Sequence, residues 1–177
     1  RRELDDSAVP ASNPVSAPAA VSAAPVAAVL APAPKYPRRY ETVTTVDALD
    51  AWLQRINTAA LTAVDTETTG LDAMVAELVG ISLAVEPGHA AYIPVGHVYA
   101  GAPVQLSRDA VLATLKSWLQ SPQHAKLGQH IKYDSHIFAN YGIRLGGIAH
   151  DTLLESYVLE SHQRHDMDSQ ALRLLSI

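Results

Sequence analysis

The chain has 177 residues, and its 13 lysines and arginines against 18 aspartates and glutamates give a formal net charge of −5. This balance argues against a protein that wraps duplex nucleic acid with a basic surface, although it allows acids that hold cations against a phosphate backbone. The absence of cysteine excludes disulfides and thiolate metal sites.

The N-terminal part is built from a few small residue types. Every residue from Ala8 to Pro34 is Ala, Val, Pro or Ser, except Asn13 and Leu30. The repeated prolines would break a membrane-spanning helix and favour an extended chain, so we interpret residues 1–38 as a disordered Ala/Pro-rich linker. No segment predicts a membrane span or a signal peptide, and we expect a cytoplasmic protein without membrane contact. From the linker and the lack of an initiating methionine, we expect a longer parent chain with a preceding domain.

Patterns typical of a folded α/β domain extend over residues 39–177. Apolar runs predict strands over residues 40–43, 61–66, 78–85, 90–95 and 125–128. Capping residues and apolar periodicity predict helices that begin at Thr45 or Asp47, at Ser107 or Asp109, near Ile131, at Asp151 and at Asp168. The turn sequence Glu86-Pro87-Gly88-His89 predicts an antiparallel hairpin between strands 78–85 and 90–95. This order predicts a mixed α/β sheet flanked by helices, compatible with a ribonuclease-H-like fold.

Two carboxylates lie at the end of the predicted strand over residues 61–66. Because side chains alternate along a strand, Asp65 and Glu67 point to the same side. Paired acids in such a place repel each other and lose hydration unless a cation joins them, and their hard oxygens suit Mg²⁺ or Mn²⁺. Taken alone, the triplet also fits a solvated acidic turn, because short acidic triplets are common by chance.

Two further segments contain candidate site residues. Asp134 lies in the first turns of a predicted helix, where a carboxylate is favoured electrostatically, and Tyr133 beside it could stack on a base or belong to the core. Arg164 could contact a phosphate, whereas Asp168 or Ser169 could simply cap a helix. The eight histidines have no zinc-binding spacing, and we interpret most of them as surface or turn residues.

Longer stretches resemble a known family. Residues 63–72 (AVDTETTGLD) and 127–134 (LGQHIKYD) resemble the first two motifs of the DEDD exonuclease superfamily, which is named for its four acids. Residues 139–143 (ANYGI), 147–157 (GIAHDTLLESY) and 164–169 (RHDMDS) resemble, more specifically, the proofreading (DEDDy) exonuclease of the bacterial DNA polymerase I large (Klenow) fragment. In that family a comparable linker joins a 5′-nuclease to the proofreading domain.

The resemblance implies a ribonuclease-H-like 3′-5′ exonuclease that removes nucleotides from single-stranded DNA 3′ ends. Its parent would be a monomeric polymerase of DNA replication and repair that also carries polymerase and 5′-nuclease domains. Two divalent ions, Mg²⁺ or Mn²⁺ with Zn²⁺ as an option at one site, would be held by the catalytic acids. Asp65 would bridge the ions, Glu67 would bind the first, and Asp134 would bind the second through water. The residues implied to contact DNA are Thr68, Leu71, Gln129, His130, Tyr133 and Arg164.

Two features depart from the family pattern. His130 stands where the family usually has Asn, and we expect this to retune a DNA contact without loss of metal. The third motif, with a Tyr and the fourth acid, would follow Ile177, so we expect the isolated chain to bind metal weakly and to cleave slowly or not at all. Two alternatives stay open: a ribonuclease-D-like RNA 3′ exonuclease with the same acids, and a catalytically silent domain that supports a polymerase.

Overall fold

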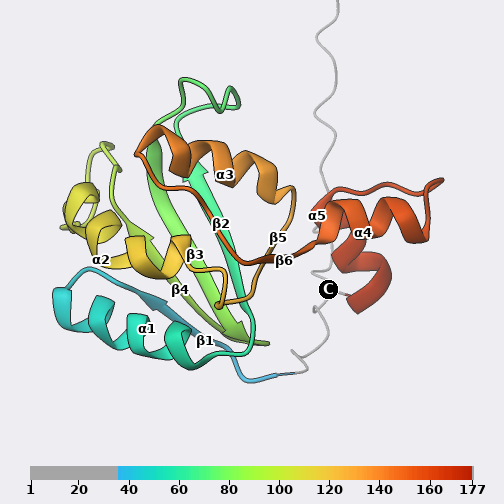
Figure 1. The fold of residues 1–177 in the computed structure, drawn as a ribbon, viewed down its shortest axis with the longest axis horizontal. Coiled ribbons are helices and arrows are strands. Elements are labelled where there is room, and N and C mark those ends of the chain that lie inside the picture. The colour runs from blue at the N-terminus through green and yellow to red at the C-terminus, as the bar shows by residue number, and fades with distance from the viewer. Residues whose placement is uncertain (1–35, 177) are drawn as a thin grey trace, which may run out of the picture. The chain divides into compact units, whose positions relative to one another are not determined.

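The computed structural model describes residues 36–176, which form a mixed sheet with helices around it (Figure 1). Six strands lie in the spatial order β1-β4-β3-β2-β5-β6. Their bounds are β1 Arg39–Thr42, β2 Thr62–Thr68, β3 Leu78–Glu86, β4 His89–Pro94, β5 Lys126–Gly128 and β6 Ile148–Asp151. Residues 1–35 of the predicted linker lie outside the described residues.

The strand pairing confirms the mixed α/β sheet. β3 pairs antiparallel with β2 and with β4, and the β3–β4 connection is the predicted hairpin. β1 pairs parallel with β4, β5 with β2, and β6 with β5. The sequence patterns do not predict β6, because its side chains are exposed or only partly buried and it has no apolar run. β2 therefore lies inside the sheet, between β3 and β5.

The helices follow the predicted order. Their bounds are α1 Val46–Thr58, α2 Arg108–Gln120, α3 Ile131–Asn140, α4 Thr152–Leu159 and α5 Met167–Gln170, with a π-helical turn over Ala171–Leu175. Thr45 caps α1 by accepting a 3.3 Å hydrogen bond from the Ala48 amide. Asp151 caps α4 by accepting a 3.0 Å bond from the Leu153 amide. These side chains satisfy amide groups that the first turn of a helix leaves without a partner.

The start of α5 differs from the prediction. Asp166, not Asp168 or Ser169, is the capping residue, and its Oδ1 accepts a 2.9 Å hydrogen bond from the Ser169 amide. Its Oδ2 also accepts a 2.8 Å bond from the Ser169 hydroxyl. An Asp three residues before a Ser can satisfy both donors, which explains why the helix begins earlier than predicted.

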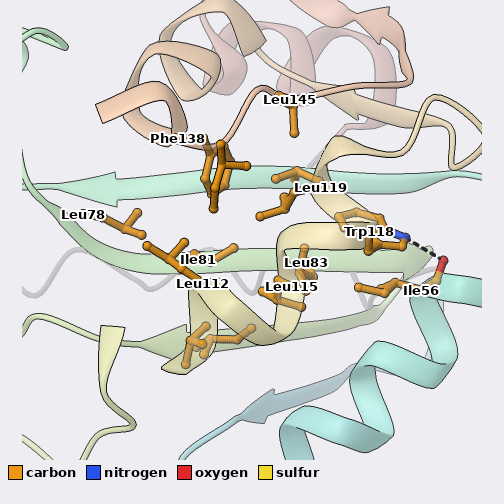
Figure 2. Packing of buried hydrophobic residues seen from close by; sticks show 14 of the residues in the cluster. Ile56, Leu78, Ile81, Leu83, Leu112, Leu115, Trp118, Leu119, Phe138 and Leu145 are labelled. Atoms are coloured by element: carbon orange, nitrogen blue, oxygen red, sulfur yellow. Dashed lines mark hydrogen bonds between the residues drawn. The ribbon is translucent and has the colours of Figure 1, made fainter. Parts of the chain in front are cut away.

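The hydrophobic core lies between one face of the sheet and helices α1, α2 and α3 (Figure 2). Alternation along β3 turns Ile81 and Leu83 into this core, where Phe138 of α3 is also fully buried. The Trp118 indole donates a 3.0 Å hydrogen bond to the Ile56 carbonyl and so joins α2 to α1. This packing fixes α3, the helix that carries Asp134, against the sheet.

Lys126 is an ionisable residue inside this core. Its Nζ donates hydrogen bonds to the carbonyls of His124 at 2.9 Å and Ser121 at 3.2 Å, and it lies 4.3 Å from the centre of the Trp118 ring. Burial lowers the pKa of Lys126 to about 8. These bonds hold the turn before β5 and thereby fix where that short strand begins and ends.

The opposite face of the sheet has smaller and partly exposed side chains. They include Ala63 and Asp65 on β2, Ser82 and Ala84 on β3, and Ala90 on β4, and they line a cavity of about 240 Å³. Helices α4 and α5 lie beyond β5 and β6, apart from α1–α3 (Figure 1). Among residues 36–176, no helix combines the length and apolarity that a membrane crossing requires.

From the burial of Phe138 in the core, we expect its truncation to lower the stability of the fold strongly. Its side chain is fully buried, so Phe138→Ala should lower the free energy of unfolding by about 3–5 kcal/mol through lost burial and a cavity. Urea denaturation followed by circular dichroism measures this. Val158→Ala is the matched control, because Val158 is 86% exposed and should change stability by less than about 0.5 kcal/mol. Similar losses for both variants would contradict the assigned core.

Candidate active site

Asp65 and Glu67 lie on β2, on the face of the sheet that α1–α3 do not cover. Burial alternates along the strand: Val64 and Thr66 are buried, Asp65 is partly exposed and Glu67 is exposed. The two acids therefore share one face, as predicted from the alternation of side chains. Because β2 is an interior strand, both carboxylates stand over the sheet and not at its rim.

Asp134 reaches the same strand through Thr66. β5 pairs with β2 only at Thr62 and Ala63, so the edge of β2 near Thr66 has no strand partner on that side. The Asp134 carboxylate replaces it: its Oδ1 accepts a 2.9 Å bond from the Thr66 amide and a 2.6 Å bond from the Thr66 hydroxyl. A buried amide without a partner would be costly, so these bonds stabilise the junction of β2 and α3.

The three acids influence one another electrostatically. Burial, followed by the charges of Asp134 and Glu67, together raise the pKa of Asp65 to about 6. Burial also raises the pKa of Asp134, although the two hydrogen bonds from Thr66 oppose this shift. A carboxylate that is hard to ionise beside two others is the situation that a bound cation relieves.

The donor chemistry of the three acids fits a hard divalent cation. All are carboxylates, which Mg²⁺ and Mn²⁺ prefer, and Asp65 already experiences the repulsion that a cation would remove. Within residues 36–176, however, no three His, Asp or Glu side chains surround a common point closely enough to hold a metal. The fold nevertheless brings Glu67 and Asp134 near enough to Asp65 for their charges to raise its pKa.

Tyr133 holds the loop after β2. Its hydroxyl donates a 2.6 Å hydrogen bond to the Gly70 carbonyl and lies 2.6 Å from the Thr68 hydroxyl. Its ring packs partly against the core, which agrees with the interpretation of Tyr133 as a core residue, while its role toward a base stays a prediction. Leu71, next to Gly70, is 97% exposed. The Tyr133 hydrogen bond thus fixes the residue that directly precedes an exposed apolar side chain.

Gln129 is occupied by bonds within the chain. Its Nε2 donates a 2.7 Å bond to the His165 carbonyl, and its Oε1 accepts a 2.6 Å bond from the Thr152 hydroxyl. The His165 ring stacks on Tyr157 at 3.7 Å between centroids. This network holds the segment that carries Arg164, whose side chain is 84% exposed and lies 3.2 Å from Asp166.

His130 occupies a backbone conformation that few residue types tolerate. Its φ of 59° and ψ of 43° lie in the left-handed region, directly before α3. Asn and His are both enriched among the non-glycine residues in this region, so His130 is compatible with this conformation. The His130 amide donates a 3.0 Å bond to Asp151, while its side chain is exposed.

Sequence patterns do not single out Tyr92 and His97, although both lie near the acids. The Tyr92 hydroxyl and His97 Nε2 are 2.6 Å apart, and burial, followed by the charge of Glu67, raises the pKa of Tyr92. Thr66 is also absent from the predicted site residues. No local signal singles out Thr66, because Thr62 is a second buried threonine on the same face of β2.

Comparison with known proteins identifies relatives of this chain. The sequence profile described as "3'-5' exonuclease" matches residues 40–177. DNA polymerase I of Pseudomonas aeruginosa is 52% identical over 139 residues, which are 77% of this chain and 15% of the relative. DNA polymerase I of Synechocystis sp. is 38% identical over 134 residues, or 74% of this chain and 13% of the relative. The chain thus spans about one seventh of the length of these relatives.

Solved structures share the fold. The POL domain of Pol1 from M. smegmatis, in complex with DNA primer-template and dNTP, has a TM-score of 0.62 and 25% identity, covering 77% of this chain and 22% of that chain. Escherichia coli RNase D has a TM-score of 0.58 and 20% identity, covering 78% of this chain and 34% of that chain. At this identity the likeness to RNase D shows the fold alone, and it confirms the predicted ribonuclease-H-like architecture.

The raised pKa of Asp65 predicts a specific pH dependence of stability. The unfolded carboxyl ionises near its ordinary pKa of 3.8 and the folded one at about 6, so stability declines as pH rises through this interval. Asp65→Asn should remove this pH-dependent loss of stability, because an amide does not ionise. In metal-free buffer the variant should match the parent below pH 4 and be more stable by roughly 1–2 kcal/mol above pH 7, after solvent screening is allowed for.

Urea denaturation at pH 3.5 and pH 7.5, with a chelator present, measures this difference. Asp50→Asn serves as the control because Asp50 is an exposed acid on α1, and its replacement should have the same small effect at both pH values. An Asp65→Asn variant that is destabilised equally at both pH values would contradict the assigned electrostatics.

Proposed function

This chain belongs to the 3′-5′ exonuclease family, and from that premise we propose that it hydrolyses the terminal phosphodiester of a single-stranded DNA 3′ end at Asp65, Glu67 and Asp134. The observation that carries this proposal is the Asp134–Thr66 connection, which draws an acid from α3 to the strand that holds the other two. The family profile places the chain among exonucleases. The acids supply the chemistry that such a reaction needs.

We assign two divalent ions, Mg²⁺ or Mn²⁺ with Zn²⁺ as an option at one site, to these acids. Asp65 would bridge the two ions, Glu67 would hold the first, and the free Oδ2 of Asp134 would reach the second through water. When bound, such ions supply an activated water and stabilise the leaving 3′ oxygen. The chain's own contribution is to hold the carboxylates over an interior strand, where partial burial strengthens their attraction for a cation.

The residues that we assign to the DNA strand are Thr68, Leu71, Gln129, His130, Tyr133 and Arg164. The exposure of Leu71 suits a wedge against the terminal bases, and single strands are bound through such sequence-tolerant apolar contacts. Thr68 and Tyr133 would support this wedge from below, through their bonds around Gly70. Because both ends of the Gln129 amide are engaged, we assign Gln129 the task of holding the segment around Arg164.

The parent protein is, in this proposal, a bacterial DNA polymerase I. The relatives named DNA polymerase I support it, because the identity to the Pseudomonas aeruginosa protein extends over most of the chain. The parent would carry polymerase and 5′-nuclease domains, act as a monomer on DNA in the cytoplasm and correct replication errors. Residues 39–177 would form the exonuclease domain, and residues 1–38 the linker before it.

Loss of the acid that we assign to bridge the two ions should slow the reaction strongly. In the complete protein, Asp65→Ala should slow Mg²⁺-dependent removal of nucleotides from a 3′-labelled single-stranded DNA oligonucleotide by on the order of 10²–10³-fold, because a preorganised charged group is lost. Gel electrophoresis of the products over time measures this rate. Asp50→Asn, an exposed acid on α1, is the matched control and should leave the rate unchanged.

Two outcomes would overturn the proposal. If Asp65→Ala degrades the 3′ end at the parent rate, the domain does not use these acids and a silent supporting domain is the better description. If the parent protein prefers an RNA oligonucleotide of the same sequence, the ribonuclease-D-like alternative replaces the DNA exonuclease.

A further inference from the structure

We propose that Tyr92 is a positioning residue for the Glu67 carboxylate, and that His97 orients the Tyr92 hydroxyl for this role. The inference rests on the proposed function, because it concerns the acid assigned to the first metal ion. It concerns two residues that lie on β4 and in the loop after it, away from β2 and α3, which supply the three acids.

The absence of a side chain at Gly80 leaves space for the Tyr92 ring of β4 to lie over the neighbouring strand β3. Tyr92 lies on β4 opposite Ser82 of β3, and both side chains belong to the face that carries Asp65 and Glu67. From there the Tyr92 ring leans over Gly80: a Cβ added to Gly80 would clash with the Tyr92 hydroxyl and with its ring atoms. A residue with any side chain at position 80 would displace the ring. The phenol thus occupies the place of a missing side chain on the neighbouring strand.

That place is next to Glu67. Glu67 and Gly80 are direct partners in the antiparallel β2–β3 pair. Side chains of such partners have Cβ atoms about 4.5–5.5 Å apart. Since the Tyr92 hydroxyl lies directly against the position that a Gly80 Cβ would take, we infer that it is within reach of the Glu67 carboxylate. The contribution of the Glu67 charge to the raised pKa of Tyr92 agrees with this proximity.

His97 fixes the other side of the Tyr92 hydroxyl. His97 Nε2 and the Tyr92 oxygen are 2.6 Å apart. The backbone of His97 is itself held by Gln105, whose amide side chain exchanges two 2.8 Å hydrogen bonds with the His97 N–H and carbonyl. The ring of Tyr99 packs edge-on against His97 at 5.4 Å between centroids. The imidazole therefore has little freedom to turn away.

The positioning role that we infer for Tyr92 depends on where the hydrogens of the Tyr92 hydroxyl and of the His97 ring lie. A phenol has one hydrogen, which it can donate either to His97 or to another acceptor. When His97 donates its Nε2–H to the Tyr92 oxygen, the Tyr92 hydrogen is free for Glu67. A carboxylate that accepts such a bond keeps one oxygen turned to its partner and presents the other to a cation, as outer partners of metal ligands generally do.

The test measures Mn²⁺ binding to the complete protein in the absence of DNA. The electron paramagnetic resonance signal of free Mn²⁺ reports how much of the ion is bound. Tyr92→Phe keeps the ring over Gly80 and removes only the hydroxyl. It should raise the Mn²⁺ dissociation constant by roughly tenfold, the scale observed when an outer partner of a metal ligand is lost. His97→Leu should have a similar effect, because Tyr92 is then no longer oriented.

A double-mutant cycle separates positioning from general destabilisation. In the Glu67→Gln background, Tyr92→Phe should have no further effect on the Mn²⁺ dissociation constant, because its target carboxylate is gone. Tyr40→Phe is the matched control: Tyr40 is a 68% exposed tyrosine on β1 and should leave Mn²⁺ binding unchanged. Thermal unfolding of each variant verifies that the fold is retained.

The outcomes distinguish this inference from the proposed function. If Glu67→Gln weakens Mn²⁺ binding but Tyr92→Phe behaves like Tyr40→Phe, the positioning role of Tyr92 is overturned and the metal site stands. If Glu67→Gln leaves Mn²⁺ binding unchanged, the assignment of Glu67 fails and the inference fails with it. A Tyr92→Phe effect that persists in the Glu67→Gln background would also overturn the role toward Glu67.

Discussion

The site depends on one hydrogen-bonding requirement at the edge of β2. β5 pairs with only the first residues of β2, so the buried amide of Thr66 needs a partner that no strand provides. Asp134 supplies it from α3, and the Thr66 hydroxyl strengthens the same contact. The requirement sets the distance between α3 and the strand. It thereby brings a third carboxylate to the place where Asp65 and Glu67 already stand.

Bringing a third carboxylate to this place lowers the stability of the folded domain when no cation is bound. Placing three acids together raises the pKa of Asp65, and burial raises that of Asp134 as well. Stability alone would favour a neutral residue at each of these positions, since repulsion and lost hydration both oppose folding. The unfavourable charge is the property that gives the site its attraction for a cation. In the proposed function, activity and stability thus make opposite demands on the same few carboxylates, as is common at active sites.

Sequence patterns predicted those features that depend on local chemistry. The apolar run of β2, the hairpin turn at Gly88 and the cap at Asp151 each follow from a few neighbouring residues, and the structure contains all three. β6 was missed because its pairing with β5, and not its composition, makes it a strand. The proximity of Tyr92 to Glu67, which we infer from the structure, cannot be predicted from the sequence for the same reason. It depends on the register of three strands and on a gap at Gly80, which no local pattern encodes.

The Asp134–Thr66 contact also has a consequence for folding during synthesis. Its partners are 68 residues apart in the chain, so β2 and β3 can be complete long before α3 leaves the ribosome. Until then, β2 exposes an unpaired strand edge of the kind that recruits other strands into aggregates. Asp134, which we propose as a catalytic acid, is therefore also the group that occupies the Thr66 amide at this edge. A slow or failed arrival of α3 should leave the nascent domain prone to association through β2.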